Sequence, residues 1–371
     1  MSPRSDLFTI GVEEEYQIIN PTTRELSPDS ELILPDAQKA LGEEVQLEIQ
    51  LSQIEIATSI CQTLADVRTQ LAHTRSEVIA AAAKHNRQIA ASASHPFSHW
   101  SNQTVTPHER YLSLEHDYQQ LTREQAIFGC HVHVGIEDRE LAVMAMNHMR
   151  PWLAALLALS SNSPFWWGTA TGYFSFRTQV WARWPFSGPP PLFSSLADRQ
   201  SLITTLMNIE SVSDPTKIYW DMRLSERFDT IEVRVMDVFM TIEDAVMAAG
   251  LVRALVQTCY EKAQRGEMFS PARHEVLRAA NWRAARYGLT GDLVDAVAER
   301  PVSARQLMRR LLDFVQPALK AQHDWEAVSA HVEYMQHYGT GAARQLATYE
   351  RTQSLQDVVD FIVSETAKGT A

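Results

Sequence analysis

Carboxylates stand close together on a segment whose neighbours are typical of a β-strand. The stretch GVEEEYQI, residues 11–18, carries three consecutive glutamates between apolar residues. Because side chains alternate between the two faces of a strand, Glu13 and Glu15 share one face and Glu14 points to the other. Acidic residues are depleted in strands and repel one another, so we expect a positive partner beside them. A bound metal ion and ion pairs with arginines both satisfy that expectation.

Two later segments repeat the pattern of charged or ligating side chains on one strand face. In CHVHVG, His131 and His133 alternate with valines, and in TIEVRV, Glu232 and Arg234 alternate with isoleucine and valine. Metal binding is one interpretation of the histidine pair, and ordinary hydrogen bonding is the other. For Glu232 and Arg234, an ion pair within the strand is the alternative to a functional role.

A fourth segment, EIQLSQIEIAT, contributes Glu48 and Glu55. These positions have opposite parity, so a bend or turn must separate them if both side chains are to face one site. A solvated strand face is the alternative for Glu55. If the four segments join one sheet, one face carries carboxylates and histidines, and the other packs against helices. Such a carboxylate-rich cluster suits Mg²⁺ or Mn²⁺ better than Zn²⁺.

Hydrophobic periodicity predicts the elements that hold these residues. We expect strands within residues 7–20, 45–58, 88–96 and 126–136, a strand–turn–strand unit over 219–238, and helices over 64–84, 138–160, 241–265, 271–286, 301–322 and 353–367, with caps at Thr241, Ser270 and Ser303. In the helix over 64–84, apolar residues recur with a period of 3.6, and Arg68, Arg75 and Lys84 are assigned to its solvated face.

The segment over residues 161–191 differs from the rest because it is rich in aromatic residues, glycine and proline. We expect no continuous regular element there. Long loops of this kind either serve a site or close a core, and both interpretations are open. No internal repeat, low-complexity tract or linker divides the chain, so one unit over residues 1–371 is expected.

Composition excludes several classes of function. The chain has 371 residues, of which 45% are hydrophobic, and a formal net charge of −12, which argues against general nucleic-acid binding. Its three cysteines lie far apart without CxxC spacing, which disfavours a disulfide framework or structural zinc and fits a reducing cytoplasm. No apolar run reaches the roughly 18 residues of a membrane span, and the first ten residues lack a signal-peptide core. We therefore expect a cytoplasmic protein without membrane or nucleic-acid partners.

Six blocks of the sequence resemble, in order and type, the glutamate–cysteine ligase type 2 family, and within it the YbdK-like carboxylate–amine ligases. The blocks are GVEEEYQI, QIEIAT, FGCHVHVGI, SSNSPFWWG with GYFSFRTQVWARWPFSGPP, WDMRLSERFDTIEVRVMD and GTGAARQ. The resemblance spans most of the chain and implies a single catalytic domain of this type. It implies an α+β fold related to glutamine synthetase, in which a curved antiparallel sheet forms a funnel with helices packed on its outer face. It also implies a homodimer or larger oligomer.

The resemblance implies a reaction between small molecules, in which a carboxylate is joined to an amine at the expense of ATP. In the best-understood members, the γ-carboxylate of glutamate joins cysteine, and YbdK-like members are weak catalysts of that reaction. A carboxylate reacts with an amine only after its oxygen becomes a leaving group, which phosphorylation achieves through an acyl phosphate. Neither a GxxxxGK[ST] nor a GxGxxG motif occurs, so ATP would be held by Mg²⁺ or Mn²⁺ and by sheet residues.

The family pattern also carries over to individual residues. It implies metal binding by Glu13, Glu15, Glu48, Glu55, His131 and Glu232. It implies that Arg234 contacts the transferring phosphate and that Arg177 binds the substrate carboxylate. Arg234 and Glu55 are the expected catalytic residues. A cation–π contact with Trp181 or Trp184 is the alternative for Arg177.

Three further residues near these blocks have less defined expectations. Arg223 and Arg227 would either help to bind nucleotide or substrate or cap the turn that contains them. His133 is expected to support a metal ligand rather than to bind metal itself.

Two other function classes are compatible with the same residues. A metal-dependent hydrolase would use the carboxylate and histidine cluster without ATP. A catalytically silent nucleotide-binding protein of the same fold would bind ATP without turnover. The hydrolase differs from the ligase because it forms product without ATP. The silent protein differs because it binds ATP without releasing ADP.

Overall fold

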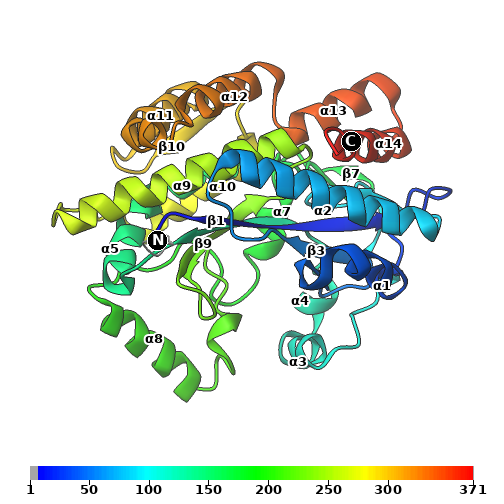
Figure 1. Ribbon diagram of the computed structural model, residues 1–371, viewed down its shortest axis with the longest axis horizontal. Helices are drawn as coiled ribbons and strands as arrows, with labels where there is room; N and C mark the ends of the chain where they lie inside the picture. The colour runs from blue at the N-terminus through cyan, green and yellow to red at the C-terminus, as the bar shows by residue number, and fades with distance from the viewer. Residues whose placement is uncertain (1–6, 371) are drawn as a thin grey trace, which may run out of the picture.

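An antiparallel sheet is the element that positions the candidate site. The computed structural model describes residues 7–370, and within that range seven strands form this sheet: β1 (Ile10–Ile19), β2 (Val45–Leu47), β3 (Gln53–Ala57), β4 (Gln88–Ala90), β5 (Gly129–Gly135), β8 (Met222–Leu224) and β9 (Thr230–Asp237). The order is β2–β3–β1–β5–β9–β8, and β4 pairs with the end of β1. Figure 1 shows β1 crossing the middle of the molecule, and its long edges pair with β3 and β5. The expected antiparallel sheet is confirmed.

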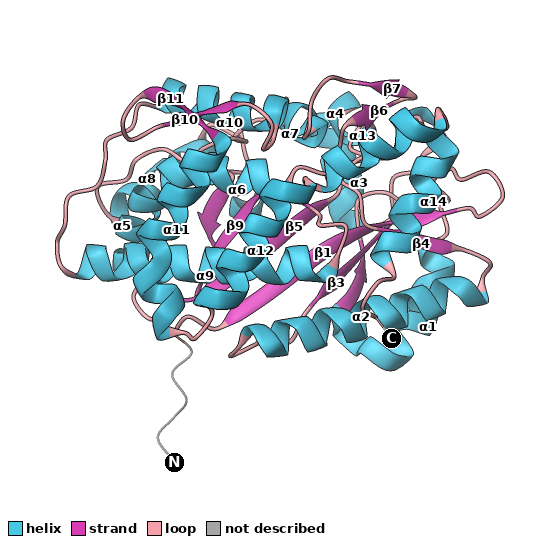
Figure 2. Ribbon diagram, turned by 90° about the horizontal axis from the view of Figure 1, so that it is seen from above, coloured by secondary structure: helices cyan, strands magenta, loops and turns pink. Residues whose placement is uncertain are grey.

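Fourteen α-helices surround this sheet within the described residues. They are α1 (Ser30–Leu41), α2 (Leu64–Lys84), α3 (Glu109–Tyr118), α4 (Gln120–Arg123), α5 (Arg139–Met149), α6 (Leu153–Ser160), α7 (Phe176–Trp181), α8 (Leu196–Asn208), α9 (Ile242–Gln264), α10 (His274–Tyr287), α11 (Ala304–Ala321), α12 (Trp325–Tyr338), α13 (Gly341–Thr352) and α14 (Leu355–Thr366). α2 and α9 lie on the sheet, and α11 and α12 pack on α9 (Figures 1 and 2). α3 and α8 lie on the opposite side of the sheet (Figure 1). The predicted packing of helices on the outer face is confirmed.

Burial along β1 follows the predicted alternation between two faces. Val12, Glu14 and Tyr16 are fully buried on the face that packs against the helices. Glu13 and Glu15 are only partly buried, because they lie on the other face. A two-residue period therefore separates the structural carboxylate from the two that face the site.

The predicted helix over residues 138–160 is wrong as a single element. Pro151 lies in a 3₁₀ turn, Arg150–Trp152, that separates α5 from α6. Proline lacks the backbone N–H that a continuous helix requires, so the break falls there. The segment over 161–191 has no continuous element, as expected, but it contains two short strands and α7. The short strands are β6 (Phe165–Trp166) and β7 (Thr169–Ala170).

Two of the three predicted caps are confirmed. The side chain of Thr241 accepts a hydrogen bond at the start of α9, and Ser303 forms a capping box at the start of α11. The prediction for Ser270 is wrong, because α10 begins at His274.

Two other predicted elements have wrong bounds. The strand predicted over 88–96 ends at Ala90, because the next backbone N–H, that of Ala91, donates to Thr366 Oγ1 instead of continuing the ladder. The first residues of the helix predicted over 301–322 lie in β11 (Arg300–Ser303), which pairs with β10 (Asp292–Asp295).

The main hydrophobic core lies between the sheet and the helices. A smaller cluster of Ile49, Leu114, Trp184 and Tyr219 belongs to the other side and lines the candidate site. The three cysteines are buried and free. Among the helices of residues 7–370, none is both long and apolar enough to cross a membrane.

Candidate active site

A cavity of about 490 Å³ opens on the polar face of the sheet. All ten residues predicted for the site line it: Glu13, Glu15, Glu48, Glu55, His131, Arg177, Arg223, Arg227, Glu232 and Arg234. The fold therefore brings side chains from five separate segments of the sequence into one pocket.

The strand register explains how these side chains meet. Residues directly opposite one another on neighbouring antiparallel strands share a face of the sheet. Three such rows cross the floor of the pocket: Gln46–Glu55–Glu15, Glu13–His131 and His133–Glu232–Arg223.

The first row holds carboxylates that have few positive neighbours. Gln46 Nε2 donates to Glu55 Oε2 at 2.7 Å, and the backbone N–H of Gly129 donates to Glu15 Oε2 at 2.7 Å. Burial, reinforced by the charge of Glu48, raises the pKa of Glu15 to about 8. Burial and the neighbouring glutamates raise the pKa of Glu55 well above its ordinary value. Both groups would ionise more readily if a cation lay beside them.

Glu48 reaches the same pocket because the chain reverses direction after it, as predicted. β2 ends at Leu47 and β3 begins at Gln53, and the two strands pair with each other. The hydroxyl of Tyr111 donates to Glu48 Oε2 at 3.3 Å. Burial raises the pKa of Glu48, as it does for the first row.

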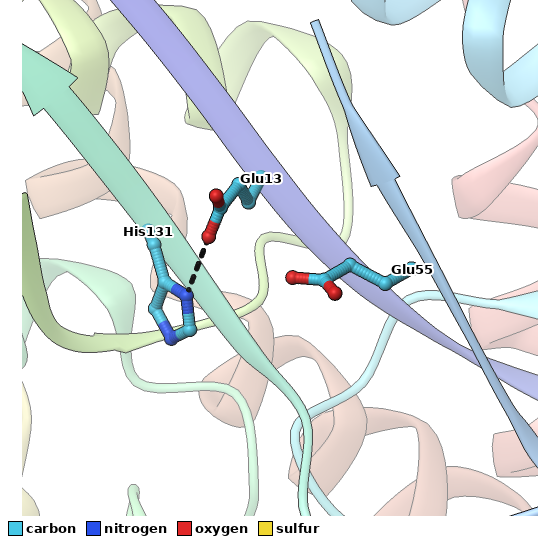
Figure 3. Close-up of side chains that lie close together, drawn as sticks. All are labelled: Glu13, Glu55 and His131. Carbon is cyan, nitrogen blue, oxygen red and sulfur yellow. Dashed lines mark hydrogen bonds and ion pairs between the residues drawn. The ribbon is translucent and has the colours of Figure 1, made fainter. Parts of the chain in front are cut away.

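The second row forms the centre of two overlapping groups of potential metal ligands. Glu13 accepts from or pairs with His131 Nδ1 at 3.1 Å and His133 Nε2 at 3.2 Å. Ligand atoms lie within 4.8 Å of one another both in the group Glu13, Glu55 and His131 and in the group Glu13, His133 and Glu232. Figure 3 shows Glu13 between His131 and Glu55, with the carboxylate of Glu55 directed toward the other two. His133 thus lies among the potential ligands, and the expectation that it supports a metal ligand stays a prediction.

The histidine and the glutamate of this row both have a pKa below the ordinary value, for different physical reasons. Burial lowers the pKa of His131 to about 4, so its ring is neutral and able to ligate near pH 7. Burial alone would raise the pKa of Glu13, but its hydrogen bonds to the two histidines outweigh that effect and lower it well below its ordinary value.

The third row joins a carboxylate to two arginines. Arg223 Nε donates to Glu232 Oε2 at 2.7 Å, and Arg234 Nη1 donates to Glu232 Oε1. Burial opposes ionisation of Glu232, but the charges of Arg234 and Arg223 outweigh it and lower the pKa of Glu232. The ion pair within the strand that the sequence allowed is therefore present. Arg234 Nε is buried without a hydrogen-bond partner among the described residues, so this donor is available to a ligand.

Arg177 reaches the pocket from the N-terminal turn of α7. The residue is 4% exposed, and its Nε is buried without a hydrogen-bond partner in the described part of the chain. Nη2 and Nη1 make long contacts with the backbone oxygens of Arg234, at 3.4 Å, and Val235, at 3.5 Å. The cation–π contacts found within residues 7–370 do not include Arg177, so the alternative of a Trp181 or Trp184 contact is not observed.

The two arginines of the β8–β9 region have different surroundings. Arg223 is held by Glu232 and by the backbone oxygens of Thr216 and Ile218. Arg227 lies in the exposed turn after β8, where its backbone N–H donates to Ser225 Oγ at 3.2 Å. Both line the cavity, and Arg227 is the more accessible of the two.

Sequence reasoning missed two site residues on α3, Arg110 and Tyr111, which line the cavity beside Glu48. Their segment, residues 109–118, has few apolar residues, so its periodicity is weak. Gln46 was also missed. The sequence signal that could have found it is the alternation of Gln46 with the apolar Val45 and Leu47, which is typical of a strand.

The GTGAARQ stretch lies outside the cavity. Gln345 donates to Asn162 Oδ1 at 2.8 Å and to Ser92 Oγ at 3.1 Å, and all three side chains are buried. A Cβ at Gly341 would lie 2.1 Å from Asn162 Oδ1, so only glycine fits there. This stretch anchors α13 to the residues that follow α6.

The donor set suits hard divalent cations. Oxygen ligands dominate, the two histidines are the nitrogen donors, and the thiol of Cys130 points to the buried side. Cations placed among Glu13, Glu15, Glu48 and Glu55 would offset the repulsion between these carboxylates. The neighbouring Arg177 and Arg234 would bind further negative groups at the edge of the cluster.

Comparison with known proteins gives a consistent result over almost the whole chain. Residues 9–361 match the model of a family described as glutamate–cysteine ligase family 2. A protein of Rhodopirellula baltica, named as a candidate glutamate–cysteine ligase 2, is 39% identical over 96% of each chain. A protein of Herpetosiphon aurantiacus with the same description is 38% identical, over 98% of this chain and 94% of that one.

Two solved structures share the fold at much lower sequence identity. Glutamate–cysteine ligase from Francisella tularensis, in complex with AMP, superposes with a TM-score of 0.73 at 10% identity, over 98% of this chain and 89% of the other. A bifunctional glutathione synthetase from Pasteurella multocida gives 0.72 at 14% identity, over 98% of this chain and 53% of the other. The predicted α+β architecture is therefore confirmed by its neighbours.

Proposed function

Because the chain belongs to the glutamate–cysteine ligase family 2, we propose that it is an ATP-dependent ligase that joins the γ-carboxylate of glutamate to the amino group of cysteine. The observation that carries this proposal is the single pocket in which carboxylates and histidines adjoin Arg177 and Arg234. Such a pocket can hold a polyphosphate through cations at one part and an organic acid through an arginine at another.

Mg²⁺ or Mn²⁺ is the cofactor that we assign to the carboxylate cluster. Its ligands would be Glu13, Glu15, Glu48, Glu55, His131 and Glu232, and the geometry adds His133 as a further candidate. Cations held by these residues would supply positive charge that neutralises the phosphates of ATP. The raised pKa values of Glu15, Glu48 and Glu55 support this assignment, because a cation would displace the protons that burial favours.

The chain's own residues would orient the two reaction steps. In the first, a carboxylate oxygen of the acid attacks the γ-phosphorus of ATP, the bond to ADP breaks, and an acyl phosphate forms. Arg234 would donate to the transferring phosphoryl group, since its Nε lacks a partner and its planar guanidinium suits phosphate oxygens. Arg223 and Arg234 both donate to Glu232, so the contact to the phosphate would come from the unpaired Nε of Arg234.

In the second step the amine nitrogen attacks the acyl carbon, inorganic phosphate leaves, and the nitrogen loses a proton. Arg177 would bind the other carboxylate of the acid through Nε and so fix which carboxylate reacts. Trp181, Trp184 and Tyr219 form an apolar wall that limits access of water to the acyl phosphate. Arg227, in the exposed turn, would contact the nucleotide at the mouth of the cavity.

The direct test is release of ADP from ATP and Mg²⁺ with glutamate and a panel of amines, with mass spectrometry of the products. We expect cysteine-dependent ADP release that matches the amount of γ-glutamylcysteine formed. Aspartate in place of glutamate is the control for the acid. Product without ATP would indicate a hydrolase, and nucleotide binding without ADP release for every pair would indicate a silent binding protein. Either result overturns the proposal.

A further inference from the structure

We propose that Gly129 is a positioning residue that sets how closely Arg177 approaches the carboxylate cluster, and thereby which acids the site accepts. This inference rests on the proposed role of Arg177 in binding the substrate's carboxylate. Gly129 begins β5, and its backbone N–H already donates to Glu15 at 2.7 Å. One position therefore contacts both the acid-binding arginine and a carboxylate of the cluster.

The space above Gly129 is filled by the guanidinium of Arg177. A Cβ built on Gly129 would lie 2.6 Å from Arg177 Nη2, 3.2 Å from Arg177 Cζ and 3.2 Å from His131 Nε2. These distances are shorter than ordinary van der Waals contact, so any side chain at 129 would displace the arginine. Gly129 is absent from the glycines with positive φ. Space, and not backbone conformation, is what requires glycine here.

Arg177 cannot move away from β5 as a whole residue, because hydrogen bonds hold its backbone in place. Its N–H donates to Ser163 Oγ at 3.1 Å, and that hydroxyl donates to Asp237 Oδ2 at 2.7 Å. Ser175 Oγ donates to the other oxygen of Asp237 at 2.8 Å. Asp237 is itself the cross-strand partner of Gly129. The start of α7 and the start of β5 are thus held in place relative to each other. Any displacement of Arg177 has to occur at its guanidinium, whose contacts with Asp237, Val235 and Arg234 are long, at 3.4–3.8 Å.

The distance between Arg177 and the cluster should therefore select the length of the acid. One carboxylate of the substrate must bind the guanidinium of Arg177 while the other lies where phosphorylation occurs. In a Gly129→Ala protein the guanidinium moves away from β5, so glutamate no longer fits both points. A misplacement of about 1 Å in a positioning group can cost on the order of 100-fold in rate, so we expect at least about a 10-fold rise in the KM for glutamate. The KM for ATP should change by less than about 2-fold, because the phosphate-binding residues stay in place.

A double-mutant cycle with Gly129→Ala and Arg177→Ala tests this coupling. If Gly129 acts through Arg177, adding Gly129→Ala to Arg177→Ala changes glutamate affinity, measured by calorimetry, by less than about 2-fold. Additive effects would overturn the inference. Mn²⁺ affinity, measured by electron paramagnetic resonance, should be equal in Gly129→Ala and wild type. A loss of Mn²⁺ affinity would show that the methyl group acts through His131 instead.

The matched control is Gly11→Ala on the neighbouring strand, where a Cβ would lie 3.6 Å from His133 Cβ, an ordinary contact. Thermal unfolding of the variants separates misfolding from repositioning. A crystal structure of Gly129→Ala gives a readout that needs no substrate, and an unmoved Arg177 guanidinium would refute the inference. Failure of the proposed function is a different result, since wild-type protein would then release no ADP with any acid and amine.

Discussion

Glu14 and Arg75 form a fully buried ion pair on the face of the sheet opposite to Glu13 and Glu15. Arg75 Nη2 lies 2.5 Å from Glu14 Oε1, and Nε donates to Oε2 at 2.9 Å. The hydroxyl of Tyr16 donates to the same carboxylate. Arg75 also donates to two backbone oxygens just after β9, those of Phe239 and Met240, each at 3.0 Å. One arginine therefore ties α2, β1 and the end of β9 together behind the site.

This pair predicts a large loss of stability when one partner is removed. Arg75→Met leaves Glu14 buried without its cation, which typically costs about 3–5 kcal/mol. The free energy of unfolding in urea measures this cost. Arg68→Met on the same helix is the control, because Arg68 and Glu243 form an exposed pair, with about half of each side chain accessible. Equal losses in the two variants would contradict the structural role of Arg75.

Replacing a proposed metal ligand should remove activity without unfolding the protein. Glu55→Gln and Glu232→Gln each keep the side-chain shape but delete a charge from one of the two ligand groups. We expect ADP formation to be abolished and Mn²⁺ binding to weaken at least about 10-fold, as is typical when a site loses a ligand or its support. Glu43→Gln, at an exposed position, is the control. Full activity in both ligand variants would refute the metal assignment.

Metal binding should depend on pH through Glu15. Its pKa is raised to about 8, so in the metal-free protein it carries a proton at pH 7, and a cation must displace that proton to bind. Affinity for Mn²⁺ should therefore rise as the pH approaches 8, by about tenfold per pH unit for each proton that the cation displaces from Glu15 or from Glu55, whose pKa is also raised. His131 contributes no such slope because its pKa is about 4. Titrations with Mn²⁺ at pH 6, 7 and 8 check this. In Glu15→Gln the number of protons released on Mn²⁺ binding should fall by one.

Arg234→Lys tests the role of a planar guanidinium at the transferring phosphate. Lysine keeps the positive charge beside Glu232 but loses the paired donors, so kcat should fall by about 10-fold or more. The KM for ATP should change less than kcat if the contact forms mainly in the transition state. An unchanged kcat would exclude this role. Arg68→Lys, far from the cavity, controls for general effects of the substitution.

Much of the sheet could be predicted because alternation on its strands is regular. Glu13, His131 and Glu232 could each be assigned a face from a two-residue period, and all three line the cavity. The prediction that Arg75 lies on the solvated face of the helix over residues 64–84 is wrong, because Arg75 is fully buried. It follows Leu71 by four residues and precedes Val78 by three, so it lies on the apolar stripe and not on the solvated face to which it was assigned. A charged residue on such a stripe is itself a signal of a buried partner.

The order and register of the strands could not be derived from periodicity. Glu13 meets His131 across 118 residues of sequence, and only the observed pairing of β1 with β5 brings them together. Tyr111 and Arg110 were missed because tertiary contacts, more than local pattern, place α3 beside the cavity. The position of GTGAARQ was equally hidden, since its glycine is required by a contact with Asn162 in a distant segment.

The central place of β1 in the sheet has a consequence for how the chain is made. β1 is made before the other strands of the sheet, and its partner β5 and the adjoining β9 come more than a hundred residues later. Until then one of its edges has no partner, and open strand edges are the places where chains pair wrongly with one another. The three adjacent glutamates of β1 repel any second copy of that strand laid beside it. Two of these glutamates, Glu13 and Glu15, line the candidate site in the folded protein, so the charges that we assign to metal binding would also oppose wrong pairing of the open edge.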